Sequence, residues 1–284
     1  MNVYIIIPYH NEENFIEATV KSIIQQSYKV KKLLFVNDNS NDKSSEILKK
    51  YVENYDWINK IDFKSTNQHL PGEKVINAFN FGLNYLDGNY NVICKFDADI
   101  ILPKNYIEKI ITVYNEDSLA GMVSGLLYIK KDEKWVYEKI AAKTHVRGPI
   151  KSYRKKCFEK IGGLKKSIGW DTVDVLLSKY NNFNVITIKD LIVKHQKHTG
   201  SNYNNTAKYL QGSALYKMRF GFILSLLSAI KRSYNLKDLN YLKNIIIGYA
   251  KSKVSNDKKI VNREEGKFIR RKIWSDIFYK LIKW

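Results

Sequence analysis

Short, wholly apolar runs alternate with amphipathic segments through the first hundred residues, and this alternation restricts the fold more than any other feature. Each apolar run is expected to be a buried strand, and each segment between two runs carries apolar residues at helical spacing. The expected strands are 3–7, 32–36, 60–65 and 91–96, and the expected helices are 14–26, 44–54 and 72–85. This order predicts an α/β fold with a mostly parallel sheet and helices on both faces.

The pattern of elements changes after residue 100. We expect helices at 103–114 and 171–180 and strand-like segments at 185–188 and 191–194. Longer helical patterns then cover 207–233, 239–253 and 263–284. We therefore expect an α/β domain over residues 1–200 and a helical C-terminal region over residues 201–284.

The C-terminal region is strongly basic. The chain has a formal net charge of +20, and residues 201–284 alone contain 18 Lys and Arg against 5 Asp and Glu. The apolar segment 220–230 is flanked by basic residues, but it is about half as long as a bilayer-spanning helix. Two hypotheses fit this pattern: a helix that lies on an anionic membrane surface, or a packed extension with a charged exposed face.

Other bulk features narrow the class of protein. At 44% hydrophobic and 27% charged residues, the chain is expected to be globular rather than disordered. Its two cysteines cannot form a disulfide framework, and the N-terminal residues do not resemble a signal peptide. We expect a cytoplasmic protein, with peripheral association on the inner face of the cell membrane as a further hypothesis. No nucleic-acid-binding motif is present, so we expect no nucleic acid partner.

Polar clusters follow three of the expected strands, at residues 9–12, 37–42 and 97–99. Parallel α/β sheets bind ligands beyond the carboxyl ends of their strands. Since the carboxyl ends of parallel strands share one edge of a sheet, the three clusters are expected to converge on one crevice.

Asp97 and Asp99 are the first candidates for chemistry in that crevice. Two carboxylates two residues apart at a strand end point to the same side, and such hard oxygen donors suit Mg²⁺ or Mn²⁺. His195 follows the strand-like segment 191–194 and is a candidate third metal ligand. The alternatives are a polar loop for the two aspartates and a structural role for the histidine.

Further candidates have equally ordinary alternatives. Asp38 could accept hydrogen bonds from a ribose or a base, or could cap a turn. Gly162 and Gly163 could let backbone approach a ligand, or could simply form a turn. Asp171 and Asp174 lie three residues apart on one helix face, where a carboxylate could act as a general base or compensate the helix dipole.

Taken together, these segments resemble the family 2 glycosyltransferases, which have the Rossmann-like GT-A fold. The resemblance covers roughly residues 1–200 and rests on the order of the motifs at 5–13, 36–44, 77–83, 96–99, 147–155, 162–164 and 169–174. It implies an inverting transfer of a sugar from a nucleotide-diphosphate sugar, a UDP-sugar by default, to a hydroxyl of a glycan or lipid-linked acceptor. The product would be a surface polysaccharide, a glycolipid or a glycoprotein glycan.

The resemblance also implies roles for individual residues. Residues 1–100 become the nucleotide-binding half and residues 101–200 the acceptor half. The donor would be bound by Pro8, Tyr9, Asn11, Glu12, Asp38, Lys74, Asn77, Asp97, Ala98 and Asp99. Asp97 and Asp99 correspond to the family's metal-binding pair for Mn²⁺ or Mg²⁺, and Gly162, Gly163 and Trp170 would lie near the acceptor. The family's Glu-Asp pair is absent, so Asp171 is the expected base, followed by Asp174. Lys74 or Arg147 could add positive charge near the diphosphate.

Two other functions compete with this interpretation. A nucleotidyltransferase would normally have a glycine-rich phosphate loop with a basic residue after the first strand, whereas residues 8–12 here are acidic and lack glycine. A basic nucleic-acid-binding protein would need basic and aromatic residues on one defined module. Here the charge lies away from the crevice loops.

Overall fold

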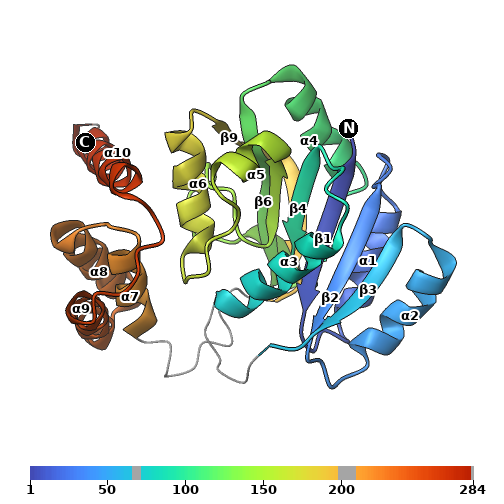
Figure 1. Cartoon of the computed structure of the whole chain (residues 1–284), viewed down its shortest axis with the longest axis horizontal. Helices are drawn as coiled ribbons and strands as arrows, with labels where there is room; N and C mark the ends of the chain where they lie inside the picture. Colours follow the sequence, from blue (N-terminus) through green and yellow to red (C-terminus); the bar gives the residue numbers. More distant parts are fainter. Residues whose placement is uncertain (66–71, 198–208, 283–284) are drawn as a thin grey trace. The chain divides into compact units, whose positions relative to one another are not determined.

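The computed structural model describes residues 1–65, 72–197 and 209–282, which form two compact units (Figure 1). The first, called the sheet unit, contains the described residues 1–65, 74–164 and 181–197. The second, called the helical unit, contains 72–73, 165–180 and 209–282. Residues 165–180 thus group with the C-terminal helices, and the boundary at residue 200 stays a prediction.

Four parallel strands form the first half of the sheet. They are ordered β3-β2-β1-β4 and comprise β1 (Val3–Tyr9), β2 (Lys32–Asp38), β3 (Ile58–Phe63) and β4 (Val92–Phe96). The central strand β1 is buried along its whole length, as its unbroken apolar sequence predicts. Because the strands are parallel, the turns after β1, β2 and β4 lie at the same edge.

The second half of the sheet continues from β4 in the order β8-β6-β9-β5. Its strands are β5 (Ile100–Ile101), β6 (Ala120–Lys131), β8 (Ile150–Arg154) and β9 (Asn184–His195), with β7 (Lys134–Tyr137) paired to β6. β8 is antiparallel to β4 and β6, whereas β9 is parallel to β6. β5 pairs with the end of β9 so that Ile100 lies opposite His195, which brings His195 next to Asp99.

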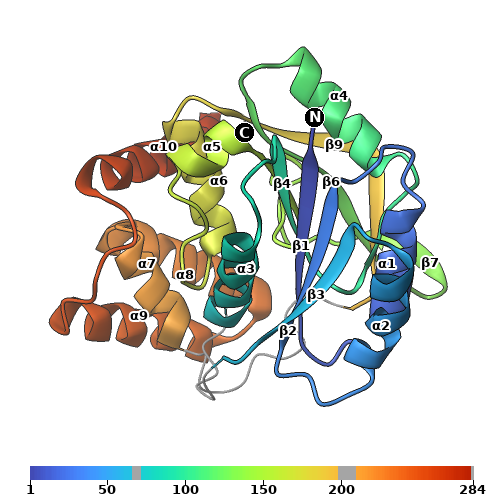
Figure 2. The ribbon, with the colours of Figure 1, turned by 45° about the vertical axis from the view of Figure 1, so that its right-hand side comes forward.

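Helices cover both faces of the sheet, as Figure 2 shows for α1 and α2 on one side and α3 on the other. The helices of this unit are α1 (Ile16–Ile24), α2 (Ser44–Asn54), α3 (Glu73–Tyr85), α4 (Tyr106–Glu116) and α5 (Lys155–Lys160). Alternate side chains of β1 explain the two layers: Ile5 joins the core with α1, α2 and α4, whereas Ile6 faces α3. A Cβ on Gly82 would lie 3.0 Å from Cγ2 of Ile6, so glycine allows α3 to pack closely.

The helical unit consists of α6 (Trp170–Tyr180), α7 (Leu210–Lys217), α8 (Phe222–Leu236), α9 (Leu239–Val254) and α10 (Arg263–Ile282). Glycines bring the backbones of α7 and α9 together, since a Cβ on Gly212 would lie 2.0 Å from the carbonyl oxygen of Ile245. The rings of Tyr180 and Phe268 connect α6 to α10, with centroids 5.5 Å apart. No helix in the described part of the chain is long and apolar enough to cross a bilayer.

Most expected elements of the first hundred residues agree with the structure to within two residues at each end. Two expectations are corrected. The segments 185–188 and 191–194 belong to one strand, β9. The helical pattern at 207–233 is interrupted, because Arg219 and Gly221 have φ of 56° and 81° and separate α7 from α8.

Candidate active site

The loops after β1 and β2 hold each other in place through side-chain hydrogen bonds. The amide nitrogen of Asn11 donates to Oγ of Ser40 at 3.1 Å, and Oδ1 of Asn11 accepts from the amide of Asn41 at 2.9 Å. The amide of Glu12 donates to Oγ of Ser44 at 2.8 Å. Two loops that are adjacent only in space therefore form one fixed wall of the candidate site.

Asn37 and Asp38 have different roles in the turn after β2: Asn37 holds the backbone of the turn, and Asp38 offers a carboxylate. The side chain of Asn37 accepts from the amide of Ser40 at 3.0 Å and donates to Oδ1 of Asp62 at 2.8 Å, so it holds the turn. Asp38 is 8% exposed, and its Oδ1 accepts from Nδ2 of Asn39 at 3.4 Å. A partly desolvated carboxylate at this edge can accept further hydrogen bonds from ribose or base donors.

Three hydrogen bonds hold the backbone of the Asp97-Ala98-Asp99 turn. The amide of Asp97 donates to the carbonyl of Pro149 at 3.0 Å, and the amide of Gln196 donates to the carbonyl of Asp99 at 2.8 Å. Oγ1 of Thr19, on α1, donates to the carbonyl of Ala98 at 2.7 Å. Elements from distant parts of the chain therefore fix the backbone from which both aspartate side chains project.

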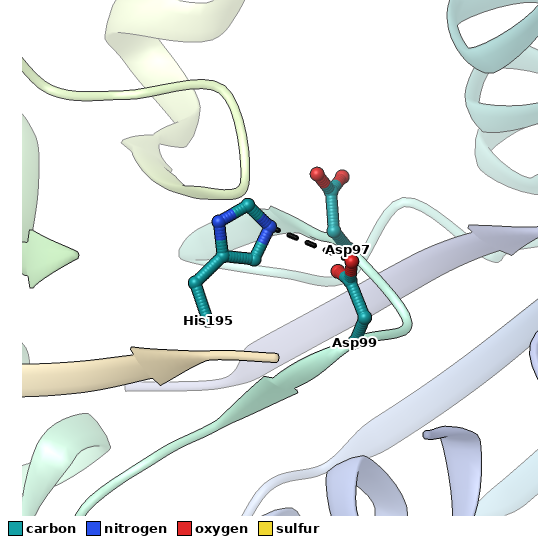
Figure 3. A group of neighbouring side chains, drawn as sticks. All are labelled: Asp97, Asp99 and His195. Carbon is teal, nitrogen blue, oxygen red and sulfur yellow. Dashed lines mark ion pairs between the residues drawn. The ribbon is translucent and has the colours of Figure 1, made fainter. Parts of the chain in front are cut away.

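Asp97, Asp99 and His195 converge on one point (Figure 3). One donor atom from each lies within 4.8 Å of the others, and Nε2 of His195 is 3.5 Å from Oδ2 of Asp99. The side chain of Asp97 is 31% exposed, whereas those of Asp99 and His195 are 10% and 4% exposed. Two carboxylate oxygens and one imidazole nitrogen, open to solvent on the Asp97 side, fit a divalent cation such as Mn²⁺ or Mg²⁺.

Buried cations accompany these acids. Lys95, one strand residue away from the turn, is 2% exposed; its ammonium pairs with Asp97 and lies 3.4 Å from the carbonyl oxygen of Gly148. Arg147 pairs with Glu138, a residue that is 2% exposed.

Lys197 pairs with Glu12 at 2.5 Å on the neighbouring loop. Sequence reasoning missed Lys95, Glu138 and Lys197. It offered Arg147, as an alternative to Lys74, as a source of positive charge near the diphosphate, and in the structure Arg147 pairs with Glu138.

Burial and neighbouring charged side chains shift the pKa values of His195 and Glu12. Burial alone would lower the pKa of His195, but the carboxylates of Asp99 and Glu138 outweigh burial and raise the pKa to about 9. Burial raises the pKa of Glu12 to about 7, against the opposing effect of Lys197. The value of about 7 already includes the nearby charges of Asp99 and Asp97, which also raise this pKa.

The other donor-site candidates differ in what they present to solvent. Pro8 and Ala98 are buried, and the Tyr9 ring is 3% exposed. The Tyr9 hydroxyl lies 2.8 Å from Oγ of Ser45, and burial raises its pKa to about 12. Lys74 and Asn77 are partly exposed and lie three residues apart, on one face of α3.

The acceptor and base candidates are divided between the two units. Gly162 and Gly163 follow α5 in the sheet unit with φ of 69° and 66°, and the amide of Gly163 donates to the carbonyl of Phe158 at 3.0 Å. This is a helix-ending turn that needs glycine. Trp170, Asp171 and Asp174 lie on α6 in the helical unit.

Comparison with known proteins identifies the family. The family described as "Glycosyl transferase family 2" matches residues 4–168. The chain belongs to this family. Its membership confirms the expected glycosyltransferase class and favours glycosyl transfer over the nucleotidyl transfer considered above.

Curated relatives are longer than this chain. The probable glycosyltransferase YdaM of Bacillus subtilis is 28% identical over 204 residues, which cover 63% of this chain and 46% of the relative. A poly-beta-1,6-N-acetyl-D-glucosamine synthase of Staphylococcus aureus is 28% identical over 116 residues, covering 41% and 26%. The chain thus spans less than half the length of these two relatives.

Solved structures share the fold at low sequence identity. S. aureus TarS 1-349 in complex with UDP-GlcNAc has a TM-score of 0.57 and 19% identity, over 79% of this chain and 66% of that one. The mannosyltransferase PcManGT from Pyrobaculum calidifontis, in complex with GDP-Man and Mn²⁺, has a TM-score of 0.57 and 14% identity, over 97% and 80%. These similarities confirm the predicted GT-A fold.

Replacing Lys95 with Met is expected to tighten Mn²⁺ binding about tenfold, because it removes a buried positive charge next to Asp97. Isothermal titration of the metal-free protein with Mn²⁺ measures the change. Lys109→Met is the control, since Lys109 pairs with Asp190 at the surface, and its affinity should equal that of the wild type. Weaker binding by Lys95→Met would show that the ion pair is needed to orient Asp97.

Proposed function

We propose that this family 2 glycosyltransferase is an inverting enzyme that moves a sugar from a nucleotide-diphosphate sugar to an acceptor hydroxyl, in surface polysaccharide, glycolipid or glycoprotein glycan synthesis. The observation that carries the proposal is the convergence of Asp97, Asp99 and His195 at the edge of the sheet that also carries the Asp38 turn. The names of structurally similar proteins, which include complexes with UDP-GlcNAc and with GDP-Man and Mn²⁺, support a nucleotide-sugar donor. UDP is the default nucleotide.

The nucleoside and the diphosphate of the donor would be bound by different residues of the chain. Asp38, at the end of β2, would accept hydrogen bonds from the nucleoside, while the wall formed by Asn11 and Glu12 limits where the nucleoside can lie. Asp97, Asp99 and His195 would hold Mn²⁺ or Mg²⁺, which supplies Lewis-acid stabilisation of the negative charge on the departing nucleotide diphosphate. Lys74 and Asn77 on α3 complete the proposed donor residues.

The inverting mechanism needs a base that removes a proton from the acceptor hydroxyl as that hydroxyl attacks the anomeric carbon. Asp171, in the first turn of α6, is partly exposed and is our proposed base. Asp174 is 1% exposed and its Oδ1 lies 2.6 Å from the amide nitrogen of Val175, so it is the weaker candidate. Gly162, Gly163 and Trp170 remain the proposed acceptor residues.

Removing either carboxylate of the candidate metal pair is expected to abolish transfer. Asp97→Ala and Asp99→Ala each remove a hard oxygen donor, so both turnover and Mn²⁺-dependent donor binding should be lost. A screen of nucleotide sugars with Mn²⁺ or Mg²⁺ measures released nucleotide and thermal stabilisation, and a chelator should remove both signals. Asp190→Ala, at an exposed position of β9, is the control. Retained Mn²⁺-dependent transfer in both variants would refute the assigned metal pair.

Asp171→Asn is expected to lower kcat by about 10²–10⁴-fold while donor affinity stays at the wild-type value, because an amide cannot accept the proton. Steady-state kinetics and donor titration separate these two effects. Asp276→Asn, at an exposed position of α10, should behave like the wild type. Turnover at the wild-type rate in Asp171→Asn would eliminate Asp171 as the base.

The surface of α8 favours a membrane-associated site for this reaction, with a lipid-linked acceptor. This helix buries Leu224 and the small residues Ser225, Ala229 and Ser233, and it exposes several large apolar residues. Five of these exposed residues, called the α8 stripe, are Phe222, Ile223, Leu227, Ile230 and Tyr234; Leu236 is also exposed, at the end of the helix. Lys231 and Lys237 are exposed near it, whereas Arg232 lies over the ring of Tyr241 on α9. Apolar side chains edged by basic ones fit the interface of a bilayer that contains anionic lipid.

The α8 stripe predicts binding to anionic vesicles. The protein should float with liposomes of phosphatidylglycerol and phosphatidylcholine and float less with phosphatidylcholine alone. Ile223→Glu with Leu227→Glu should abolish flotation, because two charges then replace apolar side chains in the bilayer interface. Leu119→Glu, at an exposed apolar position in the sheet unit, is the matched control. Flotation with neither lipid by the wild-type protein would overturn the membrane proposal.

A further inference from the structure

Glu138 is a buried acid that none of the proposed roles uses. It follows β7, its amide donates to the carbonyl of Leu127 on β6 at 3.0 Å, and it is 2% exposed. Its Oε2 atom pairs with NH1 of Arg147 and lies 3.5 Å from Nδ1 of His195. A carboxylate is costly to bury, so its position between an arginine and a histidine requires a physical explanation.

The imidazole of His195 lies between two carboxylates. Its Nε2 is 3.5 Å from Oδ2 of Asp99, and its Nδ1 is 3.5 Å from Oε2 of Glu138. A histidine that binds a metal through one ring nitrogen commonly donates the other N–H to a carboxylate, which sets the tautomer and the orientation of the ring. Glu138 lies on that second side of the ring. Nδ1 is buried and makes no hydrogen bond among the described residues, and Oε2 of Glu138, 3.5 Å away, is the carboxylate oxygen placed to receive its N–H, while Nε2 faces Asp99.

Arg147 connects Glu138 to the rest of the candidate site. Arg147 is 7% exposed and places a positive charge against the buried carboxylate of Glu138. The next two residues contact the Asp97 turn and its lysine: the carbonyl of Gly148 accepts from Lys95, and that of Pro149 accepts from the amide of Asp97. One short segment therefore holds both the Asp97 turn and the acid that faces His195.

We propose that Glu138, itself held by Arg147, is a positioning residue that orients His195 so that Nε2 faces the divalent cation. This inference rests on the proposed metal-binding role of Asp97, Asp99 and His195. It assigns to Glu138 no contact with substrate. It also separates Glu138 from Lys95: the lysine competes with the cation for Asp97, whereas Glu138 makes the histidine a better ligand.

The test is a double-mutant cycle in Mn²⁺ affinity, read from the electron paramagnetic resonance signal of free Mn²⁺ during titration of the metal-free protein. Glu138→Ala is expected to weaken Mn²⁺ binding about 10–100-fold, the usual effect of removing such a partner. In a His195→Ala background the same change should have no further effect. Glu138→Gln should recover most of the affinity, since its amide oxygen can accept the Nδ1–H hydrogen bond. Glu133→Gln, at an exposed position close to β7, is the control.

A second variant tests whether weaker Mn²⁺ binding by Glu138→Ala results merely from loss of folding. Removing one partner of a buried ion pair leaves the other unpaired, whereas replacing both with apolar residues is often tolerated. The double variant Glu138→Met with Arg147→Met is therefore expected to unfold in one cooperative transition, as the wild type does, and still to bind Mn²⁺ as weakly as Glu138→Ala.

Each outcome decides one question. Wild-type Mn²⁺ affinity in His195→Ala would overturn the ligand set of the proposed function. Weak binding in His195→Ala, together with wild-type affinity in Glu138→Ala, would overturn only the positioning role. A loss in Glu138→Ala that is equally large in the His195→Ala background would also overturn it, because Glu138 would then act without the histidine.

Discussion

The backbone of the Asp97–Asp99 turn is restrained from three sides, and the rest of the candidate site depends on that restraint. Thr19 reaches it from α1, Pro149 from the segment before β8, and Gln196 from the end of β9. The backbone that carries two mutually repelling acidic side chains is thereby held in place without a ligand to order it. The conformational entropy of the turn is therefore lost when the sheet folds, not when a ligand binds.

The parallel half of the sheet could be predicted from sequence because its strands are continuous apolar runs. The same runs end in polar clusters, so the edge where the site lies could also be predicted. The antiparallel half was harder. β9 reads as two strands because Lys189 and Asp190 interrupt its apolar pattern, yet both are exposed residues within one strand, and Asp190 pairs with Lys109.

Side chains that act through distant partners could not be predicted. Lys95 lies inside an apolar strand and belongs to no recognisable sequence motif. Its role in the site depends on its ion pair with Asp97, which only the structure reveals. Glu138 belongs to an irregular segment, and its partner His195 is far along the chain. Local periodicity contains no signal for either contact. The break before α8 did have a signal, because Gly221 adopts a left-handed conformation that a glycine readily allows.

The buried basic side chains that pair with acids of the candidate site affect how folding depends on a metal ion. Clusters of carboxylates that rely on a bound ion for neutrality commonly lose their structure when the ion is withdrawn. In this chain Lys95 neutralises Asp97, and Arg147 neutralises Glu138. If Asp97, Asp99 and His195 bind a divalent ion as proposed, these internal partners would let the polypeptide fold without it. A chain deprived of the ion would then stay intact but idle, and would resume work when the ion returned.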